Sequence, residues 1–140
     1  MIRAELNQAL LKGGERFPQV ALEKILRVVG RFVKAKNYEA SIAFVNNKTI
    51  RFANRVYRGK DSVTDVLSFS LEKNSGEILI SYSQAKKQAK EAGRGARDEI
   101  SFLIVHGLLH LFEYDHQTSK DAKKMFSLQT KILNQLYDKR

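Results

Sequence analysis

The three histidines of the chain fall in one short segment, at positions 106, 110 and 116. His106 and His110 are four residues apart, so on a helix their rings project from the same face, one turn apart. His116 follows after a stretch long enough for the chain to turn back towards them. Neutral imidazole is a common metal ligand. Three imidazoles that face one point leave the fourth position of a tetrahedral zinc ion open to water, as in catalytic zinc sites.

A simpler interpretation is that these histidines are ordinary residues. A lone helical histidine is usually a surface or core residue, and a pair at this spacing can arise by chance. The chain has no other histidine, however, and all three stand at ligand spacing. We therefore expect one Zn2+ per chain, bound by His106, His110 and His116.

Length and composition predict a single domain over residues 1–140. The 140 residues can enclose a core of their own, and a hydrophobic content of 43% is too high for a disordered chain. The chain has no cysteine, which excludes disulfides and thiolate metal ligands and suits a reducing cytoplasm. The first residues are charged at Arg3 and Glu5 and do not resemble a signal peptide. No apolar run approaches the roughly 18 residues of a membrane span, so we expect a cytoplasmic protein.

The charge of the chain favours a polyanionic partner. Lys and Arg number 25 against 15 Asp and Glu, which gives a net charge of +10. Nucleic acid is the commonest partner of such a protein. General composition can also make a protein basic, so the net charge alone does not identify the partner as nucleic acid.

Hydrophobic spacing predicts an α+β fold with a small mixed sheet packed against helices. The segment 96–112 carries the first two histidines and is the most apolar of the expected helices, so it should be central. The expected strands are 2–6 at an edge, 41–45, 66–71 and 77–82. The other expected helices are 19–36, 49–57, 83–92 and a last one capped by Ser119, with Met125, Leu128, Ile132, Leu133 and Leu136 on its apolar face.

The histidine spacing equals that of the long zinc-protease signature H-E-x-x-H-x-x-G-x-x-H, so the ligand cage is metzincin-like. The general base of those proteases is the glutamate after the first histidine, and Gly107 stands there. A peptidase is disfavoured for that reason. Gly107 can serve close packing or leave room for a substrate. The signature glycine is replaced by Glu113, which either adopts a left-handed conformation at a cost or stays helical.

Two further groups of residues are candidates for the site. Asp115 precedes a ligand and can orient a histidine ring, or can be an ordinary turn residue. Arg58 stands just before a helix-ending glycine, where a guanidinium can bind phosphate through two hydrogen bonds. The alternative for Arg58 is a charge that complements the helix dipole, and local sequence favours that alternative.

Three blocks together resemble the YbeY family of bacterial metal-dependent endoribonucleases, over about residues 40–135. The first block is Asn54…Tyr57-Arg58-x-Lys60-Asp61…Thr64-Asp65-Val66-Leu67-Ser68-Phe69, and the second is Gly76-Glu77-Ile78. The third is His106-Gly107-x-Leu109-His110-Leu111…Tyr114-Asp115-His116. The family usually has glycine where Glu113 stands and aspartate where Glu77 stands.

The resemblance implies a zinc-dependent endoribonuclease that hydrolyses single-stranded RNA. It implies a role in maturing the 3′ end of small-subunit ribosomal RNA and in ribosome quality control, with ribosome-associated proteins as partners. The family ligands fall on His106, His110 and His116, and the functional arginine falls on Arg58.

Around these residues we expect Lys60 to help bind RNA, and Glu113 and Asp115 to stand next to the ligands. Zinc would activate water and Arg58 would neutralise transition-state charge. The alternatives are a non-catalytic, zinc-containing RNA-binding or ribosome assembly factor, and a zinc amidohydrolase or peptidase.

Overall fold

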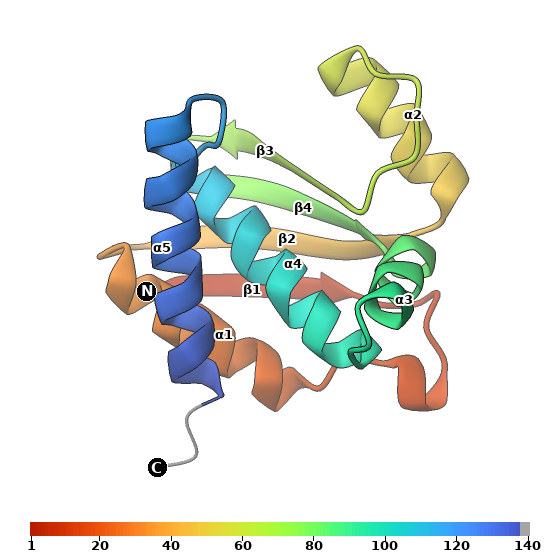
Figure 1. Ribbon diagram of the computed structural model, residues 1–140, viewed down its shortest axis with the longest axis horizontal. Helices are drawn as coiled ribbons and strands as arrows, with labels where there is room; N and C mark the ends of the chain where they lie inside the picture. Colours follow the sequence, from red (N-terminus) through yellow and green to blue (C-terminus); the bar gives the residue numbers. More distant parts are fainter. Residues whose placement is uncertain (138–140) are drawn as a thin grey trace.

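The computed structural model describes residues 1–137, and within them a four-stranded sheet is packed against five α-helices (Figure 1). The predicted α+β class is therefore confirmed. The strands are β1 (Ile2–Asn7), β2 (Tyr38–Val45), β3 (Val66–Glu72) and β4 (Ser75–Ser81). The helices are α1 (Gln19–Phe32), α2 (Asn47–Arg58), α3 (Tyr82–Glu91), α4 (Ala96–Leu111) and α5 (Ser119–Leu136), with a 3-10 turn η1 at Gly13–Glu15.

The sheet is mixed, as the sequence predicted, with the strand order β1-β2-β4-β3. Strands β1, β2 and β4 run parallel, and β3 pairs antiparallel with β4. The expected edge strand at the N-terminus is β1. Alternate residues of β2, from Tyr38 to Phe44, are buried, because successive side chains of a strand point to opposite faces.

Helix α2 lies on the opposite face of the sheet from the main core. Ile78 and Ile80 of β4 belong to the main core, which α1, α4 and α5 also form. Leu79 lies between them and belongs instead to a small cluster with Ile50 and Ala53 of α2. Since neighbouring residues of a strand face opposite ways, α2 packs on the second face. Figure 1 shows it apart from the other helices.

Helix α4 is central, as its apolar sequence predicted. Leu103, Ile104 and Leu108 are fully or almost fully buried in the main core. Gly107 lies where α4 packs closely on the sheet: a Cβ there would be 3.0 Å from Ser68 Oγ and 3.1 Å from Ile78. Close packing is thus one clear reason for a glycine in this helix.

Several boundaries differ from the predicted ones. Helix α1 ends at Phe32 and not at 36, because Lys34 turns the chain with a φ of 55° and β2 then starts at Tyr38. The cap of α5 is Thr118, whose hydroxyl accepts the N–H of Asp121 at 3.0 Å, one residue before the predicted cap. Within residues 1–137, no helix combines the length and apolarity needed to cross a bilayer.

Candidate metal centre

The three histidines meet at one point, at the C-terminal end of α4. His106 and His110 lie one turn apart on α4, and their Nε2 atoms are 3.1 Å apart. His116 comes from the loop before α5, and one nitrogen of each ring lies within 4.8 Å of the others. His106 and His110 are half-buried, whereas His116 is exposed. A cluster with this spacing can hold a metal ion that stays open to solvent.

The turn that returns His116 to the helix depends on Glu113. Its φ is 71°, so the residue is left-handed and not helical. The N–H of Glu113 donates to the carbonyl of His110 at 3.0 Å, and the N–H of Tyr114 donates to the carbonyl of Leu109 at 3.0 Å. These two bonds form a Schellman motif, in which the left-handed position is usually glycine. The chain therefore makes the glycine turn of the zinc signature with a glutamate.

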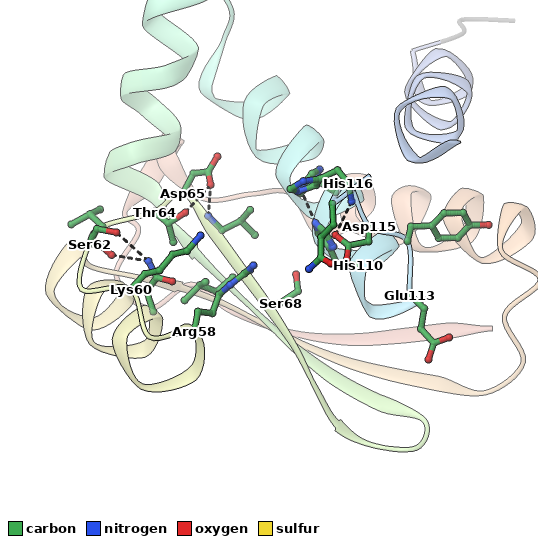
Figure 2. Close-up of a pocket in the computed structure, with 17 residues that line it drawn as sticks. Arg58, Lys60, Ser62, Thr64, Asp65, Ser68, His110, Glu113, Asp115 and His116 are labelled. Atoms are coloured by element: carbon green, nitrogen blue, oxygen red, sulfur yellow. Dashed lines mark hydrogen bonds between the residues drawn. The ribbon is translucent and has the colours of Figure 1, made fainter. Parts of the chain in front are cut away.

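The side chain of Glu113 is exposed and directed away from His110 and His116 (Figure 2). The Asp115 carboxylate accepts the backbone N–H of His116 at 2.7 Å. Among the described residues no other hydrogen bond to the Asp115 side chain is present. Both residues thus shape the loop backbone, and neither makes a hydrogen bond to an imidazole nitrogen in the described part of the chain.

Gln129, which the sequence did not point out, contacts the His106 ring on the side away from the other histidines. It lies on α5, is only 4% exposed, and its Oε1 is 3.0 Å from Nδ1 of His106. The amide oxygen accepts a hydrogen bond from Nδ1–H, so the free lone pair of His106 is on Nε2, which faces His110. A signal existed in the sequence: Gln129 is a polar residue in the buried stripe of Met125 and Ile132.

Burial favours the neutral form of the two helical histidines. The pKa of His106 is lowered, first by burial, although the hydrogen bond with Gln129 opposes this effect. The pKa of His110 is also lowered, first by burial and then by the charges of His106 and His116. Neutral imidazole is the form that binds a metal.

The histidines form one wall of an open cavity of about 600 Å³. The opposite wall comes from the end of α2 and the loop after it, and contains Arg58 and Lys60. Figure 2 shows both side chains extending towards the space in front of His110 and His116. Ser68 of β3 lies between the two walls, and its buried Oγ has no hydrogen-bond partner among the described residues. The fold thus joins residues that are about 50 positions apart in the sequence.

The loop with Lys60 is fixed to the end of α2. Arg58 is the last residue of the helix, and Gly59 ends it with a φ of 70°. The buried Asn54 donates its Nδ2 to the carbonyl of Ser62 at 2.9 Å, and its own carbonyl accepts the N–H of Lys60 at 3.2 Å. Asn54 therefore fixes the backbone of the loop that carries Lys60.

Comparison with known proteins agrees with this geometry. The sequence model of the family described as Endoribonuclease YbeY matches residues 12–137. The chain belongs to the YbeY family. A relative from Geobacillus sp. (strain WCH70), named Endoribonuclease YbeY, is 47% identical over 68% of this chain and 70% of its own length. One of the same name from Persephonella marina is 42% identical over 87% of this chain and 83% of its own length.

A solved structure gives the same result for the fold. The solution structure of the Thermotoga maritima protein TM1509 superposes with a TM-score of 0.68 at 28% identity. The alignment covers 98% of this chain and 89% of the other. The resemblance to the YbeY family expected from the motif blocks is thus confirmed.

Proposed function

We propose that this chain is a zinc-dependent endoribonuclease that hydrolyses phosphodiester bonds in single-stranded RNA. The observation that carries the proposal is the single cavity formed by the three histidines on one side and Arg58 and Lys60 on the other. A metal ion that activates water and cations that stabilise a charged transition state can together catalyse hydrolysis of a phosphodiester. The relatives from Geobacillus sp. (strain WCH70) and Persephonella marina are both named Endoribonuclease YbeY, which supports the same activity.

Zinc suits the ligands that are present. Imidazole nitrogen is among its usual ligands, and two nitrogens on a tetrahedral zinc lie about 3.3 Å apart when each bond is about 2.0–2.1 Å. His106 and His110 approach this value, at 3.1 Å between their Nε2 atoms. Gln129 adds the hydrogen bond on the far ring nitrogen that bound histidines usually have. His106, His110 and His116 would therefore hold the ion.

The chain's own residues bind and orient the substrate. When bound, zinc supplies Lewis-acid activation of water near neutral pH. The Arg58 guanidinium would bind the scissile phosphate through two hydrogen bonds and neutralise the charge that develops in the transition state. Lys60 would hold a neighbouring phosphate as a more mobile point charge. Neither contact depends on the base, so RNA shape would choose the target.

A peptidase is a weaker interpretation of the site. Its glutamate base would have to stand at position 107, where a Cβ already approaches Ser68 and Ile78 to within 3.0 and 3.1 Å. Glu113 does not replace that base, since its side chain points away from the histidines in Figure 2.

The cellular role follows the family. We propose that the substrate is ribosomal RNA, at the 3′ end of the small-subunit RNA, and that the protein acts in ribosome quality control with ribosome-associated proteins in the cytoplasm. The net charge of +10 supports an RNA partner, because cationic side chains release counterions from the phosphate backbone. Binding should accordingly weaken steeply with salt.

The direct test of the site is substitution of Arg58. Arg58→Ala should retain zinc and the fold but lose about a hundredfold or more in the rate of RNA cleavage. Arg58→Lys should recover only part of the rate, since an ammonium group lacks the planar fork. Arg31→Ala, at an exposed arginine of α1, is the matched control and should cleave normally. Normal cleavage by a folded Arg58→Ala protein would show that Arg58 is only a helix-end charge.

A further inference from the structure

One face of α2 carries aromatic and basic side chains that no other element of residues 1–137 covers. Phe52 is 58% exposed, and Val56, one turn further on, is 56% exposed. Lys48 and Arg55 are exposed on the same face, because residues three or four apart are neighbours on a helix. We name Lys48, Phe52, Arg55 and Arg58 the α2 row. Contiguous exposed apolar side chains, unlike isolated ones, often mark a binding surface.

The α2 row is entirely basic or aromatic. The segment 47–58 contains Lys48, Arg51, Arg55 and Arg58 and no acidic residue. Arg51 is already paired with Asp61, at 2.9 Å. The Arg55 guanidinium lies over one face of the Phe52 ring, 5.3 Å from the ring centre, so a cation stands beside the face that remains for a base. The depletion of acidic charge favours a polyanion over a protein surface as the partner.

The α2 row begins at the cavity. Arg58, its last member, lines the cavity that the histidines also line. Arg55 and Phe52 follow at steps of three residues away from the cavity, and Lys48 comes next at a step of four. From Lys48 to Arg58 the helix rises about 15 Å. That length corresponds to roughly four nucleotides of a stacked strand, at 3.4 Å each.

We propose that the α2 row binds the unpaired RNA next to the cut site, with one base stacked on Phe52 and the adjoining phosphates held by Arg55 and Lys48. This inference rests on the proposed function and adds to it a path for the strand. Stacking on an aromatic ring is independent of base identity, because every base has a π face. In a duplex each base is already stacked between its neighbours, so no base face is free to stack on Phe52. The α2 row would therefore select single strands.

Tyr57 is a less suitable stacking residue, although it is 62% exposed. Its ring already stacks on Phe69 of β3, with the centroids 4.5 Å apart and the planes 16° apart. One of its faces is therefore occupied, and its substitution would also disturb the packing of α2 on the sheet. Phe52 has no such contact with the sheet among the described residues, and this makes it the residue to test.

The absence of tryptophan from the chain allows a direct optical test. Phe52→Trp would place the only tryptophan in the α2 row. Val20→Trp, at a 78% exposed position on α1, is the matched control. The zinc-loaded proteins are titrated with an unpaired oligoadenylate RNA of twelve nucleotides, and then with the same strand in a duplex. Fluorescence of Phe52→Trp should be quenched by the single strand and much less by the duplex, whereas Val20→Trp should respond to neither.

Affinity supplies the second measurement. Phe52→Ala should raise the Kd for the single strand by about 5- to 150-fold, the range expected for the loss of one stacked base. Phe52→Leu, which keeps the apolar area but not the flat ring, should not restore tight binding. Wild-type affinity for both variants, with no quenching of Phe52→Trp, would overturn the inference.

The outcomes also separate this inference from the proposed function. If the wild-type protein binds and cleaves RNA while the Phe52 variants bind it equally well, the inference fails and the proposed function stands. If the wild-type protein neither binds nor cleaves RNA, the proposed function fails, and this inference fails with it. Unchanged oligonucleotide binding together with weaker retention of Phe52→Ala on small ribosomal subunits would show that the α2 row contacts the particle by something other than stacking of an unpaired base, and would also overturn the inference.

Discussion

The side-chain amide oxygen of Gln129 on α5 lies 3.0 Å from Nδ1 of His106 on α4. This contact joins the last helix to the candidate metal centre, since His106 faces His110 through its other ring nitrogen. A buried amide has few alternative partners, so the contact fixes both the ring orientation and the position of the ring proton. The C-terminal helix therefore contributes to the site without contributing a ligand.

Substitution of Gln129 should weaken metal binding. In Gln129→Leu the side chain has a similar size but cannot accept the Nδ1–H, and we expect the Kd for zinc to rise about 10- to 100-fold. Gln129→Glu keeps an acceptor and should bind zinc at least as tightly as the wild type. Competition with a chromogenic chelator measures both values. Gln135→Leu, at an exposed position of the same helix, is the control. Equal zinc affinity of Gln129→Leu and wild type would remove Gln129 from the site.

The left-handed turn at Glu113 should limit the stability of the fold. Glu113→Gly relieves the strain of a Cβ at a φ of 71° and should stabilise the protein by roughly 1 kcal/mol, with zinc binding unchanged. Lys34→Gly is a matched comparison, because Lys34 is the other non-glycine residue with positive φ in the described part of the chain. Urea denaturation measures both changes. A loss of stability in Glu113→Gly, with a gain in Lys34→Gly, would disprove strain at position 113.

Acid should destabilise the metal-free protein. The ordinary imidazole pKa is 6.5, and burial lowers the pKa of His106 and His110 in the folded state. Below about pH 6.5 the unfolded chain therefore binds more protons than the folded chain. The contribution to stability is complete above that pH and is lost as the pH falls towards the lowered values.

Urea denaturation in the presence of a chelator, between pH 7.5 and 5.5, measures this dependence. The change in the free energy of unfolding with pH should be smaller in His106→Gln, because glutamine cannot take up the proton that His106 binds on unfolding. A stability that does not change over this range in the wild type would show that the folded-state pKa values are not lowered.

Because α4 packs closely on the sheet, alanine substitution should change stability differently at two helix glycines. Gly30→Ala in α1 meets its nearest atoms at 3.7 Å and should gain up to about 1 kcal/mol from helix propensity. Gly107→Ala would place its Cβ 3.0 Å from Ser68 Oγ, and overpacking of about 1–3 kcal/mol should cancel or exceed that gain. Thermal denaturation compares the two. An equal gain at both positions would mean that α4 has room at 107.

Much of this architecture can be predicted from the sequence, because hydrophobic spacing marks the buried face of each element. Helix α4 is apolar on nearly every side, so its central position follows directly. The ends of elements are harder to predict: α1 ends at Phe32 because the chain turns at Lys34, a residue without a strong turn preference. A backbone conformation that the residue type disfavours can only be seen in the structure.

The histidine cluster was predictable for a similar reason: its spacing is local to one helix and one turn. The resemblance to the family pointed to Arg58, but the local sequence alone favoured an ordinary helix-end charge. Only the fold brings Arg58 to the same cavity as His110, since nothing in either segment encodes that the two residues line one cavity. The role of Gln129 also depends on how α5 packs against α4, which is a tertiary relationship.

The most direct test of the account is the dependence of RNA cleavage on bound zinc. Metal-free protein is titrated with zinc, and the initial rate of cleavage of a single-stranded RNA is measured together with the zinc bound to the protein. The account predicts a rate that rises in proportion to bound zinc and levels off at about one ion per chain, with little zinc and little cleavage in His110→Ala. Full cleavage by the metal-free protein, or by His110→Ala without bound zinc, would contradict it.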